Sequence, residues 1–91
     1  MKFTYKDYRI YSENERGKPL AEVVFPKVDE NTVCIEHTFV DDMLRGRGVA
    51  SKLISATVDR CRAEGYKARL SCSYAKKWFG EHPEAGDVLR R

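Results

Sequence analysis

The sequence predicts an α/β (α+β) fold with the element order β-β-β-α-β-α, and three patterns along the chain support this prediction. Short segments of alternating apolar and polar residues, rich in β-branched and aromatic side chains, lie in the N-terminal part and indicate strands. A 3.6-residue apolar period over Val49–Glu64 indicates an amphipathic helix. A basic loop punctuated by glycines, residues 45–50, joins the two patterns. Because 91 residues leave room for one small core, we expect a single domain over residues 1–91.

Three strands are predicted before this loop. Residues 8–11 alternate and include two tyrosines, so they predict the first strand. Residues 20–25 predict the second strand, and Pro26 marks its end or a bulge. Residues 32–40 predict the third strand, after a turn at residues 29–31. If the pairing of the third strand is regular, side chains alternate between its two faces, and one face then carries Val33, Ile35, His37 and Phe39.

The helix over Val49–Glu64 follows the basic loop directly. Gly65 ends it, because glycine favours the position that follows a helix C-terminus. Polar and charged residues, Ser51 and Lys52 among them, cover the side of the helix that we expect to face solvent. The side expected to face the core consists of Ala50, Leu53, Ile54, Thr57, Val58 and Cys61.

A fourth strand and a short second helix complete the predicted order. Residues 67–72 predict the strand, and a right-handed crossover through the first helix would place it beside the third strand and parallel to it. The second helix is predicted over residues 74–81, with Ser73 as its N-cap and Pro83 beyond its end. In the tail that follows, Val88 and Leu89 are the apolar residues expected to dock.

Composition and charge limit the possible functions. The net charge of +3 suits an anionic ligand but is too small to indicate nucleic-acid binding by itself. The N-terminus lacks the apolar core of a signal peptide, and no apolar run reaches membrane-spanning length. The three cysteines form no C-x-x-C pair, which argues against a disulfide framework or a zinc site. We therefore expect a cytoplasmic protein that needs no metal, is not bound to a membrane, and is a monomer or weak dimer.

The loop at residues 45–50 is the strongest functional signal. A strand, a glycine-rich basic loop and a helix in this order form a phosphate cradle, because glycines allow backbone N–H groups to converge and the helix offers its positive end. Arg45 and Arg47 add full charges. The alternative interpretation is a solvated basic turn. The cradle interpretation predicts a pyrophosphate site and hence a ligand that carries a nucleotide.

The same loop carries a family resemblance. Its sequence RGRGVA matches the R/Q-x-x-G-x-G/A signature of the GNAT acetyltransferases. The chain resembles the minimal members of that superfamily more closely, through EHTFV at residues 36–40 and SCSY at residues 71–74. The likeness covers residues 20–84 and departs from many relatives at Leu70, where they have proline. The resemblance implies a mixed sheet splayed between strands three and four, and acetyl transfer from acetyl-coenzyme A to a primary amine, either a small molecule or a protein.

The resemblance also implies where coenzyme A or acetyl-coenzyme A binds. Backbone N–H groups of residues 47–50 would hold the pyrophosphate, and the two arginines would steer and clamp it. The pantetheine arm would lie between strands three and four and bond to the main chain of residues 38–40. Ser73 belongs to the second shared segment. The expected binding residues are Thr38, Phe39, Val40, Arg45, Gly46, Arg47, Gly48, Val49, Ala50 and Ser73.

Cys72 is the candidate nucleophile. It ends a predicted strand and precedes a helix, whose N-terminus should favour the thiolate. The resemblance implies a catalytic role, in which the thiol accepts the acetyl group and passes it on. The alternative is a small core residue, which is what we expect of Cys34 and Cys61.

His37 is the candidate general base, for Cys72 or for an amine. An ordinary histidine pKa of about 6.5 suits this role. On a regular strand His37 would lie in a mostly apolar layer, whereas a bulge would redirect it. Glu36 is the second candidate base, and Tyr74 either gives a proton to the departing thiolate, as a tyrosine does in many GNAT enzymes, or packs at the helix start.

Two other functions stay open at this point. One is a non-catalytic acyl-coenzyme A-binding module on the same fold. The other is a small basic nucleic-acid-binding domain that uses Arg45, Arg47, Lys76 and Lys77 with nearby aromatic residues. The second is disfavoured, because the basic residues are not concentrated on one element.

Overall fold

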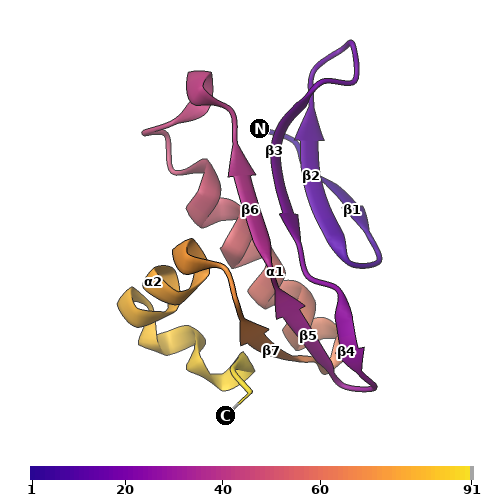
Figure 1. Ribbon diagram of the computed structural model, residues 1–91, viewed down its shortest axis with the longest axis vertical. Coiled ribbons are helices and arrows are strands. Elements are labelled where there is room, and N and C mark those ends of the chain that lie inside the picture. The colour runs from indigo at the N-terminus through magenta and orange to yellow at the C-terminus, as the bar shows by residue number, and fades with distance from the viewer. Residues whose placement is uncertain (91) are drawn as a thin grey trace.

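The computed structural model describes residues 1–90, and its strands form two sheets (Figure 1). The first sheet has the order β1-β2-β3-β6 and is antiparallel throughout, with β1 at Thr4–Lys6, β2 at Arg9–Glu13, β3 at Pro19–Val24 and β6 at His37–Val40. The second has the order β4-β5-β7, with β4 at Lys27–Asp29, β5 at Thr32–Ile35 and β7 at Lys67–Leu70. The helices are α1 at Val49–Glu64, α2 at Ser73–Glu81 and the 3-10 turns η1 at Asp42–Leu44 and η2 at Pro83–Val88. The predicted α/β (α+β) class is confirmed.

The third predicted strand is broken at Glu36 into β5 and β6. Val24 O accepts a hydrogen bond from Glu36 N–H at 3.1 Å, although the register partner of Val24 is His37. Glu36 and His37 of one strand therefore lie opposite the single residue Val24 of the other, which is a β-bulge. The bulge changes which side chains share a face. After the buried Val33 and Ile35, the core-facing side continues through the half-buried Thr38 and Val40, and His37 and Phe39 lie exposed on the opposite face. The face expected for regular pairing is therefore not formed, and the alternative, a bulge that redirects His37, is the one observed.

The bulge also divides the two sheets. β5 pairs in parallel with β7, as predicted for strands three and four, whereas β6 pairs with β3. Ile35 O accepts the N–H groups of both Ser71 and Cys72, each at 3.1 Å, at the point where the strands part. In Figure 1, β7 turns away from β6 there, and α2 lies beyond it. The splay predicted between strands three and four is confirmed.

The first helix has its predicted bounds and lies behind the sheets in Figure 1. Its C-cap Gly65 donates its N–H to Cys61 O. Leu53 and Ile54 are fully buried and, with most of the predicted apolar side, pack against β2, β3 and β6. At the N-terminus the burial differs from the prediction, because Val49 is buried and Ala50 only half-buried.

The remaining strands differ in detail from the prediction. The first predicted strand extends to Glu13 and is preceded by β1, which pairs with it in a hairpin. The second predicted strand stops at Val24, and after Pro26 the chain continues as β4 in the second sheet. Proline cannot donate to a ladder, so the change of sheet occurs where the backbone loses a donor. No helix within residues 1–90 has the length and apolar content needed to cross a bilayer.

The second helix begins one residue earlier than predicted. Its N-cap is Cys72, with an extended backbone at φ −78° and ψ 126°, and Lys76 N–H donates to Cys72 O at 3.0 Å. Ser73 is therefore the first helical residue and not the cap, which corrects the prediction. Val88 is buried and Leu89 forms a parallel bridge with Ala68, so the tail docks as expected. Residue 91, the end of the expected domain, lies outside the described residues.

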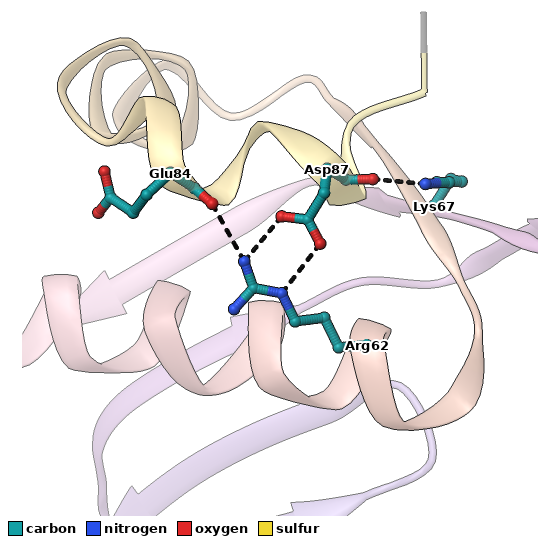
Figure 2. A network of polar contacts seen from close by, with 4 residues as sticks. All are labelled: Arg62, Lys67, Glu84 and Asp87. Atoms are coloured by element: carbon teal, nitrogen blue, oxygen red, sulfur yellow. Dashed lines mark hydrogen bonds and ion pairs between the residues drawn. The ribbon is translucent and has the colours of Figure 1, made fainter.

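A group of polar contacts holds this tail against α1 and β7, and we call it the C-terminal clasp: Arg62, Lys67, Glu84 and Asp87 (Figure 2). The Arg62 guanidinium donates to both carboxylate oxygens of Asp87, at 2.7 and 3.0 Å, and to Glu84 O at 3.2 Å. The Lys67 ammonium donates to Asp87 O. Arginine offers a planar pair of donors that matches a carboxylate, so the clasp fixes the orientation of η2.

Candidate functional site

A cavity of about 400 Å³ lies between β6 and the N-terminus of α1. Its volume falls within the range of about 300–1,000 Å³ that is typical of small-molecule sites. Three parts of the chain that are separate in sequence form its walls, namely β6, the segment from η1 into α1, and the start of α2. The lining residues are Thr38, Val40, Leu44, Arg45, Gly46, Gly48, Val49, Ala50, Ser51 and Tyr74.

The glycine loop has the geometry of an anion cradle. Gly46 and Gly48 have φ angles of 81° and 72°, a left-handed backbone that residues with a Cβ adopt at a cost. Gly48 is the N-cap of α1, and the first helical bond runs from Lys52 N–H to Gly48 O at 3.1 Å. The N–H groups of residues 49–51 therefore have no carbonyl one turn back and remain available to a ligand. These donors at the positive end of a 16-residue helix fit a pyrophosphate.

The two arginines of the loop differ in position. Arg45 lines the cavity, and its Nε lies 3.0 Å from Asp42 Oδ1 in an exposed ion pair. Arg47 is exposed and is not among the lining residues. Thus only the first arginine is part of the cavity wall, and the second can act on a charged ligand through its longer-range field.

On the opposite wall, the bulge turns β6 toward the cavity. Thr38 and Val40 line it, whereas Phe39 points to the outer face and is 38% exposed. β6 pairs with β3 along one edge, and its other edge faces the gap toward β7. A bound chain could therefore add to β6 as a strand would.

Cys72 lies across this gap from Thr38, with 3.6 Å between Sγ and Oγ1. Burial of the thiol acts to raise its pKa, but interactions with the Ala75 N–H, the Thr38 hydroxyl and the Tyr74 N–H outweigh it. The pKa of Cys72 is therefore below its ordinary value of 9.0. This is the direction that favours a nucleophilic thiolate.

Tyr74, the second residue of α2, lies at the cavity. Burial, and then the negative charges of Glu81 and Cys72, raise the pKa of its phenol. The hydroxyl is therefore protonated at neutral pH and can donate a proton.

The structure does not bring His37 to Cys72. His37 and Thr38 are successive residues of β6 and so point to opposite faces, and Thr38 is the residue beside the thiol. His37 is exposed on the outer face of the first sheet, and its neighbour Glu36 is exposed as well. Both candidate bases therefore face the solvent side of the splayed strands.

The other predicted residues are found in three kinds of place. Ser73 is exposed at the start of α2 and does not line the cavity. Cys61 is buried in the core as predicted, and burial raises its pKa to about 11. Cys34 is only half-buried, with its Sγ 3.6 Å from Ser71 Oγ, so its expected place in the core is wrong. The reason is strand alternation, which turns Cys34 away from the core between Val33 and Ile35.

Sequence reasoning missed Leu44 and Ser51 as cavity residues. The helical period assigned Ser51 to the solvent side of α1. That period separates the core side of a helix from its solvent side and gives no information about a cavity at the end of the helix. Helical side chains lean toward the N-terminus, so a polar residue in the first turn after a glycine loop lies over the end of the helix. This lean of helical side chains could have identified Ser51 from the sequence.

Solved structures include several with the same fold. A GCN5-like protein from Staphylococcus aureus superimposes with a TM-score of 0.79 and 33% identity, over 98% of this chain and 87% of that one. Rv2747 from Mycobacterium tuberculosis, solved in complex with CoA and NLQ, superimposes with a TM-score of 0.65 over 84% of this chain and 47% of that one. At 14% identity, this second likeness shows the fold alone.

Curated relatives match over a shorter part of the chain. Protein NATD1 of Xenopus tropicalis is 40% identical over 63 residues, which are 69% of this chain and 58% of that protein. Protein NATD1 of Homo sapiens is 38% identical over 63 residues, which are 69% of this chain and 56% of that protein. The match thus spans a little more than half the length of these relatives.

The family assignment rests on nearly the whole chain. Residues 7–88 match the sequence model of the family described as GCN5-related N-acetyl-transferase. The match includes the glycine loop, both diverging strands and the second helix. The chain therefore belongs to the GCN5-related N-acetyltransferase family, the GNAT superfamily that its loop and flanking segments resemble.

Proposed function

We propose that this chain binds acetyl-coenzyme A and transfers the acetyl group to a primary amine. The observation that carries the proposal is one cavity between the free N–H groups at the start of α1 and β6, the strand that diverges from β7. Family membership supports it, and so does the complex of Rv2747 with CoA on the same fold.

The binding half of the proposal assigns each wall a part of the ligand. The pyrophosphate would bond to the N–H groups of residues 47–51, with Arg45 at the rim and Arg47 steering from outside. The pantetheine arm would bond to main-chain groups of residues 38–40 along the open edge of β6. The terms that favour binding are thus hydrogen bonds to an anion and strand-like pairing.

The transfer half uses residues around the gap. When bound, acetyl-coenzyme A supplies an activated acetyl thioester. An amine nitrogen would form a bond to the acetyl carbon while the carbon–sulfur bond breaks. His37, on the outer face, would take the proton of an amine that approaches from that side, and Tyr74 would protonate the leaving sulfur. Backbone N–H groups of β6 would stabilise the carbonyl oxygen as it becomes negative.

Cys72 offers a second route for the same overall reaction. Its thiolate, favoured by the lowered pKa, would form a bond to the acetyl carbon while the carbon–sulfur bond to coenzyme A breaks and coenzyme A leaves as a thiolate. In a second step the amine would attack this carbon and the Cys72 thiolate would leave. The two routes differ in one observable, a stable mass increase of one acetyl group on Cys72 when no amine is present.

Calorimetric titration with acetyl-coenzyme A, with ATP as the control, tests the binding half. We expect a binding free energy of about −8 kcal/mol, the micromolar range, which ATP does not match. A screen of amines would then test transfer. Tight binding without turnover on any amine would indicate a non-catalytic acyl-coenzyme A-binding module, and absence of binding would overturn the proposal.

Gly48→Ala tests the loop. At φ 72° an added Cβ meets no atom within 4 Å, so the expected cost is backbone strain of about 1–2 kcal/mol and not a clash. Relief of that strain would move the N–H groups at the start of α1, and we expect at least a tenfold loss of coenzyme A affinity. Gly80→Ala is the matched control, because Gly80 lies in α2 with equal room and no positive φ. Equal affinities of the two variants would contradict the loop assignment.

A further inference from the structure

One side chain of α2 reaches the helix end that forms the proposed pyrophosphate site. The indole Nε1 of Trp78 lies 2.8 Å from Ser51 Oγ. An indole N–H can only donate, so the serine oxygen must accept and the serine proton must point elsewhere. Within residues 1–90, Trp78 is the only hydrogen-bond partner of the Ser51 side chain. The hydroxyl is thus left as an oriented donor without a protein acceptor.

Ser51 stands where such a donor is useful. It is the third residue of α1, it lines the cavity with Gly48 and Ala50, and its own N–H is free. Two donors of one residue therefore lie at the positive end of the helix. Because a negatively charged acceptor roughly doubles the strength of a hydrogen bond, an anion is the ligand that fits this pair best.

Trp78 is held firmly enough to set this orientation. It is 6% exposed, its ring packs edge-on against Phe79 with centroids 5.0 Å apart, and it stacks on His82 at 3.9 Å and 11°. His82 Nδ1 lies 2.7 Å from Trp78 O, which ties the stacked ring to the same residue. The indole N–H therefore has little freedom to leave Ser51.

We propose that the Ser51 hydroxyl donates to the pyrophosphate of coenzyme A, and that Trp78 is a positioning residue that holds the hydroxyl in the donating orientation. The inference rests on the proposed coenzyme A site. It adds a side-chain ligand to a site otherwise made of backbone donors, and it links the placement of α2 to affinity for the nucleotide part of the substrate.

Titrations of four proteins with two ligands test this proposal. The proteins are the wild type, Ser51→Ala, Trp78→Phe and the double variant, and the ligands are coenzyme A and pantetheine, which lacks the phosphates. Ser51→Ala should weaken coenzyme A by roughly tenfold or more, because a hydrogen bond to a charged group is lost. Trp78→Phe should weaken it by about threefold to tenfold, since the hydroxyl remains but rotates. The double variant should match Ser51→Ala, and pantetheine affinity should change by less than about twofold throughout.

The controls separate this role from damage to the fold. Ser55→Ala, at an exposed position one turn further along α1, should bind both ligands as the wild type does. Equal weakening of both ligands in Ser51→Ala, unchanged coenzyme A affinity, or losses that simply multiply in the double variant would each overturn the inference. If the wild type binds coenzyme A, those results leave the proposed function standing; if it does not bind, both proposals fail.

Discussion

At the scale of single residues, the thiols of Cys72 and Cys61 differ only in their surroundings. Cys61 is 1% exposed, and burial raises its pKa to about 11. Cys72 is half-buried at the start of α2, where nearby N–H groups and the Thr38 hydroxyl lower its pKa below 9.0. Hydrogen bonding to the charged form thus outweighs desolvation at one thiol but not at the other.

This contrast predicts the pH dependence of alkylation. Because only the thiolate reacts, the rate for Cys72 with iodoacetamide should rise with pH to a midpoint below 9.0. Thr38→Val should move that midpoint upward, since the hydroxyl that favours the thiolate is removed. Mass spectrometry of a Cys34→Ala background isolates Cys72, with Cys61 as the internal slow control. A wild-type midpoint at or above 9.0 would contradict the assigned environment.

At the scale of elements, the bulge at Glu36 makes the site possible. Without it, the alternation of Val33 and Ile35 would carry His37 and Phe39 to the core side and turn Thr38 and Val40 outward. With it, Thr38 and Val40 line the cavity and Thr38 meets Cys72. One extra residue therefore decides which side chains reach the gap.

Deletion of Glu36 should remove the bulge. Without Glu36 the strand would be regular and Thr38 and Val40 would still face the core, but β5 would continue into β6 without the bulge that divides the two sheets, so we expect the free energy of unfolding to fall by about 2 kcal/mol or more and coenzyme A binding to be abolished. Glu36→Ala keeps the bulge and changes only an exposed side chain, so its stability should lie within about 0.5 kcal/mol of the wild type. Urea unfolding and calorimetry measure both quantities. Wild-type stability and affinity in the deletion variant would show that the bulge has no such role.

The elements also show how far sequence reasoning could go. The bounds of α1 were predicted correctly, because a long apolar period and a terminal glycine are local signals. The bulge could be raised only as an alternative, since residues 32–40 also fit a regular strand and only the pairing of β6 with β3 reveals the extra residue. The glycine loop was predictable from its residues, whereas the contact between Ser51 and Trp78 depends on how α2 packs against α1.

At the scale of the whole molecule, two sheets that diverge need other elements to hold them together. α1 packs across β2, β3 and β6 and then connects to β7, so it spans the divergence. The C-terminal clasp joins the last turns of α1 to β7 and η2 (Figure 2). Tyr74 of α2 lines the cavity, and Trp78 of α2 bonds to Ser51, which also lines it, so the contacts that hold α2 and the tail in place also hold one side of the site.

The C-terminal clasp should make the stability of the fold depend on pH. Hydrogen bonding to the Arg62 guanidinium holds the pKa of Asp87 below its ordinary value of 3.8. A carboxyl whose pKa is lower in the folded state stabilises that state at pH values above the ordinary pKa, and this contribution disappears as pH falls through the lowered pKa.

Asp87→Asn should therefore melt at a lower temperature than the wild type at about pH 7, and the difference should close only below pH 3.8. The ion pair is exposed, so the difference in melting temperature between the wild type and Asp87→Asn should also shrink as salt is added. Glu30→Gln, at an exposed turn, is the control, and its melting temperature should follow that of the wild type at every pH. Melting curves by circular dichroism decide the matter, because a difference between wild type and Asp87→Asn that persists unchanged below the lowered pKa would mean that the Asp87 charge does not stabilise the docked tail.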